Sequence, residues 1–117
     1  DLIISGDSAG GGLTLTSLLK LKEENLSLPA AAICLSPVTD FAISGESIKT
    51  KAKEDIMLTE NEIRKSFEIY AKGQSVKHHL ISPLYADLSG LPPDHLPDSH
   101  CYIGYSHQPK TALMDLN

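Results

Sequence analysis

The 117-residue sequence has no tryptophan, little aromatic content (5%) and only two cysteines. So few rings offer no platform on which nucleic-acid bases could stack. Cys34 and Cys101 lie far apart and show no CxxC spacing, so we expect neither a disulfide framework nor a zinc site. This sparse use of cysteine favours a reducing, cytoplasmic compartment.

Long basic blocks and long apolar runs are absent as well. The net charge is −5 and the ten Lys and Arg residues form no block, which argues against a nucleic-acid partner. No apolar run approaches the roughly 20 residues that a membrane-spanning helix requires. The length suits one small domain. Because the sequence lacks an initiating methionine and begins within a predicted strand, we expect a fragment.

What is present is a strand–helix–strand pattern. Residues 2–4 form a short apolar strand, and the spacing of the leucines after Ala9 predicts a helix to about Glu24. Residues 29–36 form a second apolar run without alternation, which is typical of a buried strand in a parallel sheet. Together these segments predict a right-handed βαβ unit and therefore an α/β fold.

A later helix is marked by its cap. Residues 37–55 are polar and irregular, and Thr59 is then expected to be the N-cap of a helix, with Glu62 completing a capping box. Gly73 is expected to end this helix. Three apolar residues, spaced four and three positions apart, share one face of it: Ile63, Phe67 and Tyr70.

A serine stands between glycines at the predicted junction of the first strand and the first helix. A serine hydroxyl is a poor nucleophile unless a base takes its proton and hydrogen-bond donors receive the oxyanion. A sharp strand-to-helix turn would lift the Ser8 side chain out of the sheet edge, and Gly6 and Gly10 would allow the close approach of backbone that the turn needs. The N–H of Ala9, at the helix start, would point to where negative charge develops.

This arrangement is the nucleophile elbow, G-x-S-x-G. The competing interpretation is a glycine-rich turn that only packs helix against strand, or that holds a phosphate at the helix N-terminus. A dinucleotide-binding fingerprint would require G-x-G-x-x-G, which the sequence does not contain.

Three blocks occur in the order of a known family: GDSAGG (6–11), PAAAICLSPVTDF (29–41) and ISPLYADLSGLPP (81–93). In them the sequence resembles the hormone-sensitive-lipase-like branch of the α/β-hydrolase superfamily, which contains carboxylesterases and lipases. The resemblance covers most of residues 1–93 and implies a partial α/β-hydrolase domain there, with helices on both faces of a parallel sheet. It implies hydrolysis of short acyl esters, small-molecule substrates, through an acyl-enzyme without cofactor or metal. It also implies roles for five residues: nucleophile Ser8, oxyanion donor Ala9, and elbow residues Gly6, Asp7 and Gly10.

The sequence departs from the family at several positions. Gly12 stands where the family usually has asparagine, and we expect it to loosen the first helical turn. The HGGG-like loop that supplies further oxyanion donors belongs upstream of Asp1, and the catalytic histidine belongs beyond Asn117. After Pro93 the family pattern is lost, and Thr111 would occupy the position of the triad acid. We interpret residues 94–117 as an atypical tail, frameshifted, mis-spliced or unrelated.

The remaining polar residues receive no catalytic role. Asp7 is adjacent to the serine, where it either anchors the elbow or is exposed to solvent, and Asp40 resembles a structural position of the family. His100 and His107 lack any matching block, and no metal site is expected. Cys34 is expected in the core. Four further residues are expected to be solvated in loops: Asp55, His78, His79 and Asp87.

Two other functions stay open at this point. One is a non-catalytic relative that binds a small ligand in the same pocket, and the other is a truncated product without function. The triad histidine would distinguish the enzyme from the binding protein. Because parallel strands need both faces covered, we expect the isolated chain to be molten or prone to aggregation, and catalytically inactive.

Overall fold

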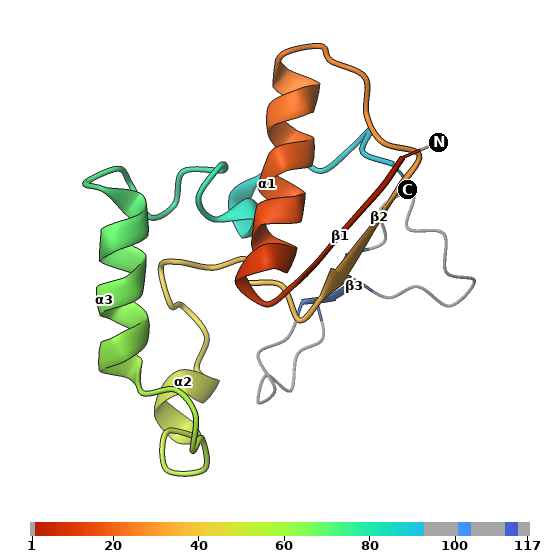
Figure 1. Cartoon of the computed structure of the whole chain (residues 1–117). Coiled ribbons are helices and arrows are strands. Elements are labelled where there is room, and N and C mark those ends of the chain that lie inside the picture. Colours follow the sequence, from red (N-terminus) through yellow and green to blue (C-terminus); the bar gives the residue numbers. More distant parts are fainter. Residues whose placement is uncertain (1, 93–100, 104–111, 115–117) are drawn as a thin grey trace.

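The computed structural model describes residues 2–92, 101–103 and 112–114. Its centre is a βαβ unit, formed by strand β1 (Ile3–Asp7), helix α1 (Ala9–Glu23) and strand β2 (Ala31–Leu35) (Figure 1). The two strands pair in parallel, with Ile3 opposite Ala31 and Asp7 opposite Leu35. The strand–helix–strand prediction is therefore confirmed, with α1 ending one residue earlier than expected.

Helix α1 packs against one face of the strand pair. Its leucines recur at helical spacing, so Leu18 and Leu19 reach Ala32 of β2 in one buried cluster. Leu15 packs against Cys34, which is buried as expected. Strand residues alternate between faces, and Ile3 and Leu35 on the opposite face are 59% and 58% exposed.

Helices α2 (Ser47–Thr50) and α3 (Glu60–Ala71) lie to one side of this unit (Figure 1). The predicted irregular stretch thus contains one short helix. The capping box is confirmed: the Thr59 side chain accepts from the Glu62 N–H, and the Glu62 carboxylate accepts from the Thr59 N–H at 3.1 Å. Helix α3 ends at Ala71, with Lys72 (φ 46°) as its C-cap and Gly73 (φ 80°) directly after it, so Gly73 stands just past the helix end as predicted.

The predicted apolar face of α3 is confirmed for two of its three residues. Ile63 and Phe67 are buried against Val38, which follows β2. Tyr70 is 51% exposed, although its ring stacks on Phe41 with a centroid distance of 5.1 Å. These contacts join α3 to the segment that leaves the sheet.

The capping box gives a local prediction for α3. Thr59→Ala removes the side-chain acceptor of one N–H at the helix start, which costs about 1 kcal/mol. Amide hydrogen exchange in the first turns of α3 should therefore become about five-fold faster in the full-length protein. Exchange in α1 is the internal control, and equal acceleration in both helices would contradict a local effect.

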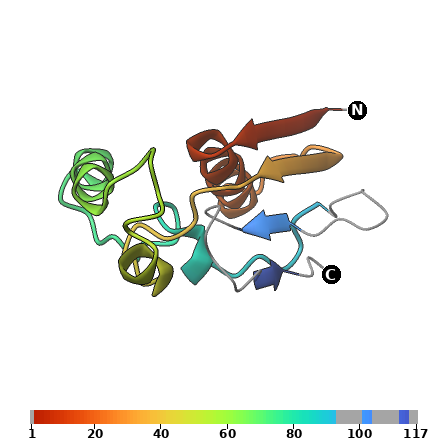
Figure 2. The same cartoon turned by 90° about the horizontal axis from the view of Figure 1, so that it is seen from below.

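The last described residues form a 3-10 turn and two strands that were not predicted from the sequence. A 3-10 turn (Pro83–Tyr85) is followed by strands β3 (Cys101–Ile103) and β4 (Ala112–Met114), which pair antiparallel. Viewed from below, β3 lies beside β2 on the side away from β1 (Figure 2). The rest of the predicted atypical tail, with Thr111, His100 and His107, lies outside the described residues.

Candidate active site

A single residue makes the turn from strand to helix. Strand β1 ends at Asp7 and α1 begins at Ala9, so Ser8 alone changes the chain direction. Its backbone has φ 55° and ψ −118°, a conformation that residues with a side chain rarely adopt. The Ser8 side chain is exposed and makes no capping hydrogen bond to α1. The hydroxyl is therefore presented outward from a strained position.

Three backbone hydrogen bonds hold this strained conformation. The Ser8 N–H donates to the Leu35 carbonyl at 2.9 Å, at the carboxyl end of β2. The Ser8 carbonyl accepts from Gly12 at 3.1 Å and from Val38 at 3.0 Å. Strain of this kind persists only where the surroundings determine the conformation several times over, and it is concentrated at functional sites.

Close backbone contacts explain the glycines around Ser8. A Cβ at Gly6 would overlap the Gly10 carbonyl oxygen, and a Cβ at Gly11 would come within 2.9 Å of Pro37. A Cβ at Gly12 would overlap the Val38 carbonyl oxygen. The missing side chain of Gly12 lets the first turn of α1 meet the segment after β2, and the expected loosening of that turn stays a prediction.

Gly10 differs from its neighbours. Among the described residues, no atom would lie within 4 Å of a Cβ placed there. It is the Gly10 carbonyl oxygen, not its Cα, that takes part in the close approach to Gly6. Within the described residues the absence of a Cβ is therefore required at Gly6, Gly11 and Gly12 rather than at Gly10, and the assignment of Gly10 to the elbow stays a prediction.

The start of α1 offers unused hydrogen-bond donors beside Ser8. The first four N–H groups of a helix, Ala9 among them, lack partners within the helix, and the helix dipole makes this end electropositive. No acidic residue in the first turn neutralises it. Asp7 is exposed, which favours solvent exposure over the anchoring role. An anion that formed at the Ser8 side chain would thus meet donors.

Asp40 has a structural role, as expected. Its carboxylate accepts hydrogen bonds from the Ala42 N–H at 2.9 Å, from the Ser44 N–H at 2.7 Å and from the Ser44 hydroxyl at 2.6 Å. The charge is used to fold the loop that leaves β2. Asp55 acts similarly, accepting from the N–H groups of Met57 and Leu58.

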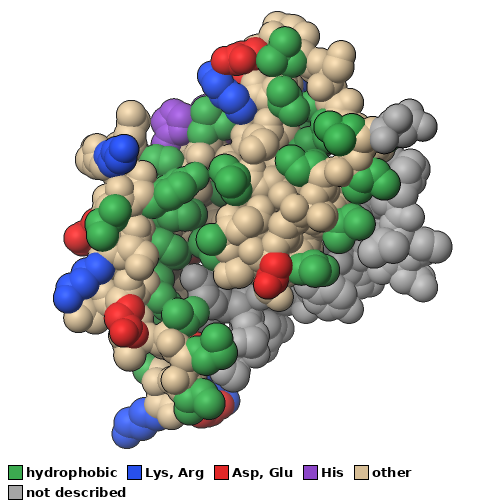
Figure 3. Space-filling view, viewed as in Figure 1, with side chains coloured by type: hydrophobic (Ala, Val, Ile, Leu, Met, Phe, Trp, Pro, Cys, Tyr) green, Lys and Arg blue, Asp and Glu red, His purple; other side chains and the backbone are tan. Residues whose placement is uncertain are grey.

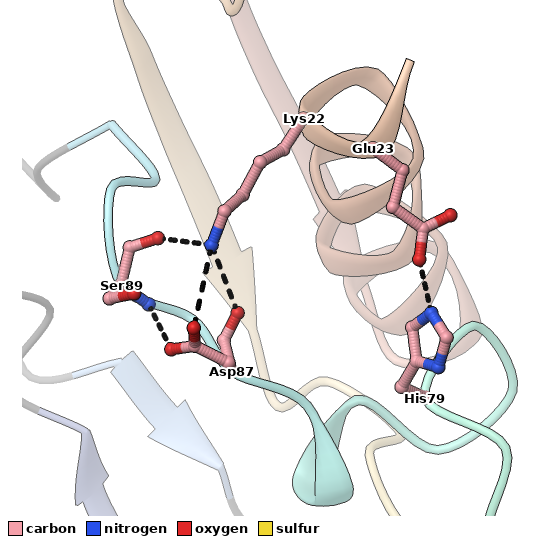
Figure 4. Close-up of polar contacts among 5 residues, drawn as sticks. All are labelled: Lys22, Glu23, His79, Asp87 and Ser89. Atoms are coloured by element: carbon pink, nitrogen blue, oxygen red, sulfur yellow. Dashed lines mark hydrogen bonds and ion pairs between the residues drawn. The ribbon is translucent and has the colours of Figure 1, made fainter. Parts of the chain in front are cut away.

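Polar contacts from Lys22 and Glu23 tie the last turn of α1 to residues on both sides of the 3-10 turn (Figure 4). Lys22 Nζ donates to the Ser89 carbonyl at 2.5 Å and lies 3.8 Å from the Asp87 carboxylate, while Glu23 contacts His79. The Ser89 N–H donates to Asp87 and holds the pKa of that carboxyl below its usual range. The side chains of Asp87 and His79 are 79% and 40% exposed, as expected for solvated loop residues, and both also contact α1.

These contacts leave no described histidine beside Ser8. Helix α1 has 15 residues, so its two ends lie about 20 Å apart, and Glu23 holds His79 at the far end. The His78 ring stacks on His79 with a centroid distance of 4.5 Å. Within the described ranges, no three His, Cys, Asp or Glu side chains could hold a metal ion. In the same ranges no helix is long and apolar enough to cross a membrane.

Sequence reasoning missed the residues that support Ser8 from a distance. Val38 and Ser82 are buried, and both make hydrogen bonds in the region between Ser8 and the 3-10 turn. Both lie in blocks that resemble the family, and that resemblance was the only available signal.

Comparison with known proteins finds similar stretches in proteins named as esterases. An acetyl-hydrolase of Streptomyces hygroscopicus is 42% identical over 90 residues, which cover 77% of this chain and 30% of that protein. An esterase of Acinetobacter venetianus is 36% identical over 103 residues, covering 80% of this chain and 31% of that protein. The crystal structure of a hormone-sensitive lipase from a metagenome library is 47% identical, with a TM-score of 0.74 over 79% of this chain and 32% of that one.

The chain thus spans about a third of the length of each of these relatives. Residues 1–96, which contain the Ser8 turn, the βαβ unit and the 3-10 turn, match the profile of the alpha/beta hydrolase fold. The match covers well over half of the chain and agrees with the parallel strand pair and with the likeness to the solved lipase. The chain belongs to the alpha/beta hydrolase fold family.

Proposed function

We propose that the protein containing this chain is a carboxylesterase that hydrolyses short-chain acyl esters, with Ser8 as its nucleophile. The conformation of Ser8 is the observation that carries the proposal. Its strained backbone sits just beyond the carboxyl ends of two parallel strands, which is where α/β proteins bind their ligands. Relatives named acetyl-hydrolase and esterase support the same reaction class.

The proposed reaction has two stages. Ser8 Oγ attacks the ester carbonyl carbon while a base takes its proton, and the Ala9 N–H, with other donors, receives the developing oxyanion. Collapse of this tetrahedral intermediate expels the alcohol, which takes the proton back from the base, and leaves Ser8 acylated. Water then attacks the acyl-enzyme in the same way and releases the carboxylic acid. The residues named need no metal or cofactor for these steps.

The base is proposed to come from the remainder of the longer protein. His78 and His79 are held away from Ser8, and the solved relatives are about three times as long as the stretch that matches. Further oxyanion donors are proposed to come from outside the chain as well. The chain by itself is therefore proposed to be inactive.

Exposed apolar surface indicates that the chain packs against the remainder of the longer protein. Hydrophobic side chains cover much of the face that carries α1 and β1 (Figure 3). Leu2, Ile3, Leu13 and Leu35 are all more than half exposed. Parallel sheets are stable when both faces are covered, so we propose that the remainder of the protein covers these residues.

Covalent labelling tests the proposed nucleophile. A fluorophosphonate should react with the full-length protein and add its mass to the tryptic peptide that contains Ser8, because it traps an activated serine. Ser5→Ala is the matched control: this exposed serine lies three residues upstream on β1, and labelling should persist in the variant. Absence of the label, or its presence on another serine, would refute the assignment.

A further inference from the structure

Ser82 is the most deeply buried polar residue of the described chain, with 0% exposure. Its hydroxyl makes two hydrogen bonds: it donates to the Val76 carbonyl at 2.5 Å and accepts from the Phe41 N–H at 2.8 Å. A hydroxyl has one donor hydrogen, so both of its roles are used. Ser82 thus joins the loop after α3 to the segment after β2.

A second hydrogen bond strengthens this junction. The Leu84 N–H donates to the Thr39 carbonyl at 3.1 Å, two residues beyond Ser82 and two residues before Phe41. Thr39 is itself buried, with 5% exposure. The segment of residues 38–41 is therefore fixed at two points by the stretch that begins at Ser82, and Pro83 at the start of the 3-10 turn is fully buried beside it.

The same segment supports the candidate nucleophile. The Val38 N–H donates to the Ser8 carbonyl, and the Val38 carbonyl lies against Gly12 in the first turn of α1. Phe41 is only three residues further along. A shift of residues 38–41 would lengthen the bond from Val38 and release one of the three restraints on the Ser8 backbone.

We propose that Ser82 is a positioning residue for Ser8. Without its hydroxyl, the Phe41 N–H and the Val76 carbonyl lose their partner in the interior, and such groups shift to regain hydrogen bonds. The shift passes along residues 38–41 to Val38 and loosens the Ser8 turn. Ser82 does not touch the reacting atoms. This inference rests on the proposed function for its catalytic effect, but not for its structural one.

The test compares Ser82→Ala with Thr59→Ala in the full-length protein. Both variants remove one side-chain hydroxyl that serves a backbone N–H, but the Thr59 hydroxyl caps the start of α3, whereas the Ser82 hydroxyl holds Phe41 of the segment that leads to Ser8. For Ser82→Ala we expect kcat for short-chain esters to fall about 10- to 100-fold with KM nearly unchanged, since small displacements of reacting groups have effects of this size. Amide exchange at Val38 should become at least ten-fold faster. Thr59→Ala should leave kcat unchanged and should affect exchange at Val38 far less than Ser82→Ala does, because α3 meets Val38 only through the side chains of Ile63 and Phe67 among the buried residues of that cluster.

Each outcome decides the proposal. Faster exchange at Val38 with an unchanged kcat would reduce Ser82 to a structural residue, and a lower kcat without faster exchange would exclude the route through Val38. If Ser82→Ala does not fold, Ser82→Cys keeps a weak donor in the same place and carries the test. Wild-type kcat and Val38 exchange in that variant would overturn the proposal.

Failure of the proposed function is distinguishable from failure of this inference. If the full-length protein is not an esterase, no kcat for esters can be measured. Amide exchange at Val38 still reports whether Ser82 holds the Ser8 turn. Ser82→Thr, which keeps the hydroxyl, should restore slow exchange at Val38 wherever the added methyl group is accommodated. Fast exchange in a folded Ser82→Thr protein would show that the hydroxyl does not hold the segment.

Discussion

Ser8→Ala is expected to lower kcat for short-chain p-nitrophenyl esters by about 10⁴- to 10⁶-fold in the full-length protein. The substitution removes the only atom proposed to form the acyl-enzyme, and no other group takes over that bond. Alanine tolerates the turn no worse than serine, because the restraints on residue 8 are backbone hydrogen bonds to Leu35, Gly12 and Val38. Substrate binding and the fold should therefore survive, and KM should change little.

The measurement is a steady-state assay with an unfolding curve on the same samples. Ser5→Ala is again the control, since it lies on β1 and is exposed, and its kcat should remain within two-fold of wild type. If a folded Ser8→Ala protein keeps more than a hundredth of the wild-type kcat, Ser8 is not the nucleophile. If the wild type binds small esters without cleaving them, a ligand-binding relative is the better description. If the wild type neither binds nor cleaves small esters, the better description is a truncated product without function.

The sequence was sufficient where the signal is local. The strand–turn–helix at Ser8 and the capping box at Thr59 each depend on fewer than ten consecutive residues, whose types have direct physical meanings. The buried strand β2 was predictable because an apolar run without alternation has few other uses in a short segment. These predictions also located the candidate nucleophile.

The sequence was insufficient where a role depends on distant neighbours. Gly12 is required by Val38, and Gly10 is not required by any described atom; no spacing rule separates these two glycines. The contact between Lys22 and Ser89 spans 67 positions, so Lys22 was indistinguishable from any other lysine near a helix end. The strands β3 and β4 have three residues each, too few for a pattern to emerge.

Burial of Ser82 shows the same limit more sharply. A serine directly before a proline, such as Ser82 before Pro83, is a sequence pattern that predicts an exposed turn. Here the hydroxyl is fully buried, because the Phe41 N–H and the Val76 carbonyl need a partner in the interior. The tertiary fold determines which polar groups must be satisfied inside, and only the structure shows that this serine supplies both hydrogen bonds.

Gly6→Ala is expected to cost about 3 kcal/mol or more of folding free energy and to abolish labelling of Ser8. The added methyl group would overlap the Gly10 carbonyl oxygen, which belongs to the backbone of α1 and cannot rotate away. Relief requires moving the first turn of the helix off the end of β1, and overpacking against rigid atoms has costs of this order. The same movement would displace the Ala9 N–H from the serine, so reactivity should be lost even in molecules that remain folded.

Gly10→Ala is the matched control, because it adds the same methyl group four residues away, where it would meet no described atom. Alanine is also the better helix former, so this variant should be as stable as the wild type or slightly more stable. Denaturant unfolding and fluorophosphonate labelling of the three full-length proteins measure both effects. Equal behaviour of the two variants would mean that the strand and helix do not meet as closely as the Gly6–Gly10 contact requires. Loss of stability and labelling in Gly6→Ala alone would tie the reactivity of Ser8 to that contact.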